Sequence, residues 1–192
     1  MLDIRRFVGL AAVAAPLLHT ITDLLEWSQG GFSQGQLWLN YAAFLPMPAL
    51  MVGLYAAQRP TIGQAGLWGA LLYGGSFVYF AHTTLWALAE GATDYAMLWS
   101  RLGPTYTVHG AVMVVGGLLF GAAAWRARAL PRIAAGLFLG GILLNLGVGL
   151  LPLPEILQTL GSGVRNVGLM LMGAHLLRAP APSRPRADTG GA

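Results

Sequence analysis

The sequence contains neither cysteine nor lysine, and charged residues of either sign are scarce. Without cysteine, the chain can form no disulfide, no thiolate metal site and no cysteine-held iron–sulfur cluster. The absence of lysine excludes Schiff-base chemistry on a lysine side chain. Only 9% of the residues are charged, whereas a typical soluble domain has about 25%. So little charge cannot cover a water-facing surface, and we expect lipid to cover most of this one.

The charge that is present argues against a nucleic-acid partner. The formal net charge is +4, and all of the basic residues are arginines. A nucleic-acid-binding protein gathers its basic residues on one water-exposed face. Here the arginines lie between long apolar runs, which is typical of a membrane protein.

Six apolar runs are long enough to cross a bilayer. A hydrocarbon core about 30 Å thick needs about 20 apolar residues in helical form. None of the runs has the alternating pattern of a membrane β-strand. The sequence therefore predicts an all-α membrane protein with a six-helix transmembrane domain in residues 1–178 and a disordered cytoplasmic tail in 179–192. The predicted spans are residues 7–28, 37–57, 65–89, 105–125, 133–151 and 157–177.

The arginines also orient the spans. The loops and ends on one side hold Arg5, Arg6, Arg59, Arg126, Arg128, Arg132, Arg178, Arg184 and Arg186. The loops on the other side hold only Arg101, with the acidic residues Glu90, Asp94 and Glu155, of which we expect Glu90 and Asp94 to be solvated loop charges. By the positive-inside rule both termini are cytoplasmic, and we expect a multi-pass protein of the inner (plasma) membrane.

Small residues and prolines give two further expectations. The spacings Gly117-x-x-x-Gly121 and Gly136-x-x-x-Gly140 favour close helix contacts. Pro46 and Pro48 fall inside the second run, where they should kink the helix and free backbone carbonyls. Such a kink either opens a cavity or simply improves packing.

Polar side chains interrupt the runs at similar depth. Measured along each helix, they lie about 6 to 12 Å from the predicted outer ends. Ionisable groups inside a membrane are costly and usually functional, so we expect one shared site near the outer face. The residues are His19, Asp23, His82, His109, Asn145, Arg165 and Asn166.

Their spacing suggests roles. His19 and Asp23 lie one helical turn apart, so the carboxylate can orient the imidazole. Arg165 should face inward, either as the partner of Asp23 or as a clamp for an anionic ligand. Asn145 is expected to donate an interhelical hydrogen bond, and His175 to lie at the membrane surface beside the last arginine of the final span.

Three histidines on separate helices suit a metal or haem. His19, His82 and His109 could ligate zinc, copper or haem iron. No single helix carries a close His-x-x-x-His pair, whereas haem takes single ligands from facing helices.

The segment around His109 resembles a known family. Val108-His109-Gly110-Ala111-Val112-Met113-Val114 is similar to the haem-ligand helix of subunit I of the haem–copper oxidases, where a methionine follows the histidine by four residues. That family also has a proline at the next helix boundary, and Pro131 stands 131 − 109 = 22 residues on. The resemblance implies that His109 is an axial haem ligand. The family's copper-ligand histidine pair and tyrosine motif are missing, so oxygen reduction is not implied.

The leading hypothesis is therefore an inner-membrane haem b protein. His109 would be one axial ligand and His82 or His19 the other, while Asp23 orients His19, Arg165 meets the propionates and Asn145 joins the same site. Electron transfer with quinone or a redox partner would take place near the outer face, and a homo-oligomer is compatible with this picture.

Three alternatives stay open. One is a small proton-coupled carrier that uses His19, Asp23 and Arg165. The second is a membrane enzyme acting on an apolar or lipid substrate with histidine and aspartate as acid and base, or a haem-dependent isomerase. The third is an accessory subunit whose polar layer only joins the helices. Whether the chain is an enzyme is left undecided by the sequence.

Overall fold

The fold is a bundle of α-helices, which confirms the all-helical prediction. The computed structural model describes residues 4–151, 154 and 156–178, and these residues contain no strand. The predictions for Glu155 and for the tail 179–192 lie outside the described residues. The helices are α1 Ile4–Gln29, α2 Gln34–Phe44, α3 Met47–Ala57, α4 Gly63–Glu90, α5 Tyr95–Leu102, α6 Pro104–Ala127, α7 Arg132–Leu150 and α8 Ile156–Arg178.

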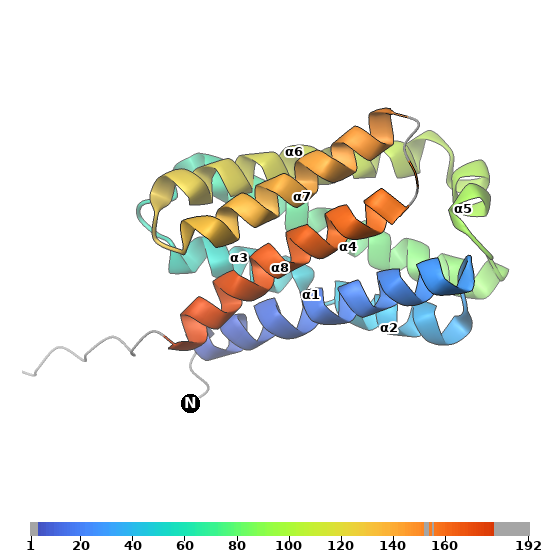
Figure 1. The fold of residues 1–192 in the computed structure, drawn as a ribbon, viewed down its shortest axis with the longest axis horizontal. Helices are drawn as coiled ribbons and strands as arrows, with labels where there is room; N and C mark the ends of the chain where they lie inside the picture. The colour runs from blue at the N-terminus through green and yellow to red at the C-terminus, as the bar shows by residue number, and fades with distance from the viewer. Residues whose placement is uncertain (1–3, 152–153, 155, 179–192) are drawn as a thin grey trace, which may run out of the picture.

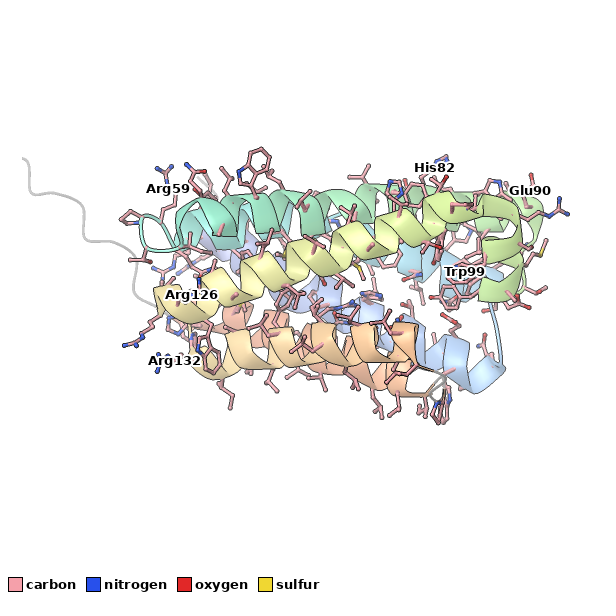
Figure 2. The ribbon with its side chains drawn as sticks, turned by 90° about the horizontal axis from the view of Figure 1, so that it is seen from above. Arg59, His82, Glu90, Trp99, Arg126 and Arg132 are labelled. Carbon is pink, nitrogen blue, oxygen red and sulfur yellow. The ribbon has the colours of Figure 1, made fainter. Side chains whose placement is uncertain are left out.

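The long helices run side by side along the longest axis of the molecule, and α8 lies between α1 and α7 (Figure 1). The short helix α5 lies across one end, opposite the end at which the chain begins (Figure 1). Arg59, Arg126 and Arg132 gather at the end away from α5, whereas Glu90 and Trp99 lie at the α5 end (Figure 2). The structure thus places these loop arginines together at one end of the bundle.

Four stretches are long and apolar enough to cross a membrane: α1, the α2–α3 stretch Gln34–Ala57, α6 and α7. Helices α4 and α8 are of similar length but are not among these four stretches. In α8 the polar side chains of Arg165 and Asn166 are buried inside the bundle. In α4 the buried hydroxyls of Ser76 and Thr84 bond to carbonyls of their own helix. Both helices therefore hide polar groups in the interior of the bundle.

The second predicted run is broken rather than merely kinked. Helix α2 ends at Phe44 and α3 begins at Met47. Proline has no N–H, so Pro46 and Pro48 cannot donate to carbonyls one turn back, and two such losses within one turn favour a break between α2 and α3. Helix α3 restarts with a bond from the Leu50 amide to the Pro46 carbonyl.

Glycines divide the bundle into two sets of closely packed helices: α3, α4 and α6 form one set, and α1, α7 and α8 form the other. A Cβ atom added at Gly69 or Gly116 would meet backbone across the α4–α6 contact. Gly141 and Gly168 meet backbone in the same way between α7 and α8, as Gly173 does between α8 and α1. The glycines that face the other set meet side chains instead, and these are Gly53 on Val8, Gly117 on Ile142, Gly121 on Leu139 and Gly136 on Trp125.

The predicted glycine spacings are only partly used in this packing. Gly117, Gly121 and Gly136 are close to neighbouring helices, but an added Cβ at Gly140 would meet nothing within 4 Å. The residue that packs against α8 is its neighbour Gly141. Aromatic rings of α4, α6 and α7 fill the space between the two sets through Tyr73, Phe138 and Phe120.

Helix α5 was not predicted from the sequence. Asp94, expected to be a solvated loop charge, is exposed and also caps this helix, because its Oδ1 accepts a hydrogen bond from the Met97 amide at 2.8 Å. Leu98 packs beneath it in a small apolar cluster with Leu37 and Ala87. Eight residues are too few to give a strong periodic signal, so the cap was the available clue.

Candidate functional site

Five of the predicted site residues meet in a polar cluster inside the bundle. Helix α1 supplies His19 and Asp23, α7 supplies Asn145, and α8 supplies Arg165 and Asn166. The Arg165 side chain is only 2% exposed, although it carries a full charge. We define the polar cluster as His19, Thr20, Asp23, Asn145, Ser162, Arg165 and Asn166, all from the set α1, α7 and α8.

His19 stands between the two charged groups of the polar cluster. Its Nδ1 lies 3.5 Å from Arg165 Nη2, and its Nε2 lies 3.4 Å from Asp23 Oδ1. A guanidinium can only donate, so Nδ1 must accept and Nε2 must carry the proton. His19 is then neutral, and one arginine balances one aspartate. The expected Arg165–Asp23 pairing is therefore bridged through an imidazole.

Amides and hydroxyls extend the polar cluster across three helices. Asn145 donates from Nδ2 to Ser162 Oγ at 3.2 Å, which confirms its expected role as an interhelical donor. Ser162 in turn lies close to the Asp23 carboxyl group. Asn166 accepts from Arg165 Nε at 3.4 Å and donates to Thr20 Oγ1 at 3.0 Å. These bonds tie α1, α7 and α8 into one unit.

Aromatic side chains of α2 and α4 cover the polar cluster. The His19 ring meets Phe44 and Phe77 edge to face, at centroid distances of 4.9 Å and 6.0 Å. The buried hydroxyl of Tyr73 lies within electrostatic range of Arg165. Between these aromatic side chains and the arginine-rich end of the bundle, the described residues form an apolar core that includes Phe120 and Phe138. This closed side gives no support to the carrier hypothesis.

The structure does not bring the three histidines together. His82 is exposed on the outer edge of α4 (Figure 2), and no described residue is its hydrogen-bond partner. His109 stacks on Tyr79 of α4 at a centroid distance of 3.6 Å, away from the polar cluster. His175 is exposed in the last turn of α8, as expected. Similar depth therefore did not imply a common pocket.

The surroundings of His19 do not fit a haem ligand. Both ring nitrogens of His19 are engaged, and two phenylalanine rings pack against it. The described residues also contain no group of three or more histidine, aspartate or glutamate side chains that could hold a metal ion. His109 keeps a form that suits a ligand. Its Nδ1 donates to the Thr105 carbonyl at 2.8 Å, which leaves the Nε2 lone pair free.

A groove of about 250 Å³ opens on the side of the bundle at the α2–α3 break. Its rim includes Leu45 and Val78, which are 56% and 61% exposed. Two of its lining residues, Phe44 and Phe77, are the rings that pack against His19. The groove, which we call the lateral groove, is lined by Tyr41, Phe44, Leu45, Pro48, Phe77, Val78, Ala81, His82 and Leu85.

A second group of polar residues lies at the α5 end. Burial of the Tyr95 hydroxyl raises the pKa of this residue well above its ordinary value, and the nearby Tyr106 and Glu26 raise the pKa further. Tyr95 is also a hydrogen-bond partner of Glu26 and therefore remains a donor. This contact joins α5 to the end of α1.

Sequence reasoning missed Tyr73, Ser162 and the lateral groove. Tyr73 and Ser162 were passed over because hydroxyls are common in membrane helices and carry no charge. Comparison of the chain with protein-family models, with curated proteins and with solved structures gives no match. The function is therefore argued from the geometry alone.

Proposed function

We propose that this chain is a six-span membrane protein that takes a lipid-soluble substrate from the bilayer into the lateral groove. One observation carries the proposal: the groove opens sideways at a helix break and has an imidazole without a hydrogen-bond partner, His82, in its lining. The alternatives of an electron carrier or an accessory subunit do not account for such an opening. Of the open hypotheses, this supports the membrane enzyme acting on an apolar substrate.

The proposal includes α4 and α8 as spans. Arg165 and Asn166 of α8 and Ser76 and Thr84 of α4 lie inside the bundle, whereas exposed side chains such as Trp68, Val78 and Leu171 give both helices a largely apolar outer face for lipid. With six spans, and with the arginine-rich loops in the cytoplasm, both termini lie on the cytoplasmic side. The lateral groove then lies in the outer half of the bilayer.

Within the lateral groove, His82 is the group that gives or takes a proton. A neutral imidazole has one donor and one acceptor nitrogen, which suits general acid–base chemistry near neutral pH. Tyr41 provides a hydroxyl from α2, on the other side of the groove. The polar cluster behind Phe44 and Phe77 holds α1, α7 and α8 as a firm back wall.

Filling the lateral groove tests the proposal. The probe is a long-chain hydrocarbon that carries a photoreactive diazirine, added to the purified chain in lipid nanodiscs. Labelling should map to the groove and should disappear in Ala81→Phe, since Ala81 is 6% exposed and lines it. The matched control is Leu71→Phe, a lipid-exposed position on the same helix outside the groove. Equal labelling of both variants at the groove residues would refute the proposal.

The free Nε2 of His109 favours a second candidate, a haem protein with His109 as its single protein ligand. Metal-ligating histidines usually donate their other ring N–H to a backbone carbonyl, as His109 does. Haem supplies redox or Lewis-acid chemistry when bound. Purification after expression with added haem should give a Soret band that is lost in His109→Ala and kept in His175→Ala. Absence of the band would exclude this candidate.

A further inference from the structure

The lining of the lateral groove contains no aspartate, glutamate or arginine side chain. Of its nine lining residues, seven are apolar, and Tyr41 and His82 are the two with polar groups. A charged head group in so apolar a site would need an opposite charge close by. Arg165, the only fully buried arginine among the described residues, is already balanced by Asp23 and lies behind the ring of His19. An anionic or zwitterionic ligand would therefore find no permanently charged partner.

The two polar residues are at one end of the lateral groove. Helix α4 runs toward the α5 end, so His82 and Leu85 are nearer that end than Phe77 and Val78. Helices α2 and α3 run the opposite way, so Tyr41 is nearer the α5 end than Pro48. The groove is thus polar toward the membrane surface and apolar toward the middle of the bilayer.

The size of the lateral groove limits the occupant further. From Phe77 to Leu85 the α4 residues rise about 12 Å along the helix. Ligand sites for drug-sized molecules usually measure about 300–1,000 Å³, whereas this groove measures about 250 Å³. It has room for a single slender chain but not for the two tails of a phospholipid.

The chemistry of the two polar residues restricts which head group the lateral groove can bind. A phenol and a neutral imidazole can each donate and accept hydrogen bonds. A hydroxyl group matches both roles at once, whereas a carboxylate can only accept and brings a charge. Trp38 stacks edge to face on Tyr41 and is 56% exposed, as expected for an aromatic residue at the membrane interface. A head group beside Tyr41 would lie at that interface.

We propose that the lateral groove binds an uncharged single-chain amphiphile, a long-chain or isoprenoid alcohol, with its hydroxyl at His82 and Tyr41 and its chain directed toward Pro48. This inference rests on the proposed function, because it names the substrate class of the same groove.

The test compares three diazirine probes in nanodiscs: a fatty alcohol, the fatty acid of the same chain length, and a phosphatidylcholine bearing the same chain. The alcohol should label the lateral groove at least about tenfold more efficiently than the acid, the difference expected from one lost hydrogen bond or more. In His82→Phe the labelling by the alcohol should fall by about tenfold, while labelling by a plain hydrocarbon probe stays unchanged. His175→Phe is the matched control and should behave as the unaltered chain.

The outcomes separate the two claims. If the acid or the phosphatidylcholine labels the lateral groove as well as the alcohol does, and His82→Phe has no effect, the alcohol assignment is overturned while the lateral opening stands. If no probe, the plain hydrocarbon included, labels the groove above the level in Ala81→Phe, the proposed function fails as well. His82 is exposed, so its replacement by phenylalanine leaves the core intact.

Discussion

Removal of the Arg165 charge is the most direct test of the polar cluster. The change Arg165→Met keeps a long side chain and a good helix former but leaves Asp23 without its opposite charge. Breaking a buried ion pair by deleting one partner costs about 3–5 kcal/mol. The lost hydrogen bonds, to His19 at 3.5 Å and to Asn166 at 3.4 Å, are long and contribute about 0.5 kcal/mol each.

The assay is reversible unfolding in mixed micelles, followed by circular dichroism. Arg165→Met should lower the free energy of unfolding by about 3–5 kcal/mol. The double variant Asp23→Asn with Arg165→Met should recover part of that loss, because it removes the unpaired carboxylate too. Side-chain hydrogen bonds alone average about 0.6 kcal/mol in membrane proteins, so a larger coupling identifies the charge pair.

The matched control is Arg178→Met, at the exposed end of the same helix. It should leave the free energy of unfolding nearly unchanged. If Arg165→Met does not accumulate in cells, recovery of folded protein in the double variant is the readout. Equal stability of Arg165→Met and Arg178→Met would refute the charge-balance reasoning.

Three further predictions concern the fold. Gly141→Leu should destabilise the chain by about 1–3 kcal/mol or more, because its side chain would meet the Arg165 backbone, whereas the adjacent Gly140→Leu should be tolerated; equal unfolding free energies would contradict the packing. Phe138→Ala should cost about 3–5 kcal/mol in the same assay, since this buried ring contacts Tyr73 and Phe120, and a smaller loss would mean that the site collapses around the cavity. Because the chain has no cysteine, the single-cysteine variants Thr61→Cys and Ser28→Cys can each be tested with an impermeant maleimide on intact cells. We expect Ser28→Cys to react and Thr61→Cys not to react. The reverse result would invert the topology.

The sequence predicted the helices better than it predicted their faces. Composition and run length are enough to locate α1, α4, α6, α7 and α8, because a bilayer demands about 20 residues per crossing. The break after Phe44 followed from two prolines. The short helix α5 is too short to be predicted from run length, and the N-cap residue Asp94 was the only sequence feature that indicates where it begins.

Depth was predictable because helix rise is constant, but depth alone does not assemble a site. Each residue turns the direction of the side chain by about 100°. His82 and Phe77 are five residues apart on α4, and His82 is exposed while Phe77 is 1% exposed. A shared layer of histidines therefore said nothing about which of them face one another.

The small residues nevertheless indicate which face of each helix is buried. In a membrane helix, lipid is as apolar as the core, so hydrophobicity does not mark the buried side, whereas close backbone contact does. On α1, Gly9, Ala12 and Ala15 lead at helical spacing to His19, which is buried. On α8, Gly161 and Gly168 flank Arg165 on the same face. On α4, Gly66, Gly69, Ala70, Gly74 and Ala81 form such a face, and the buried residues Phe77 and Thr84 continue it. His82 lies beside this face rather than on it, and for that reason it is free to line the lateral groove.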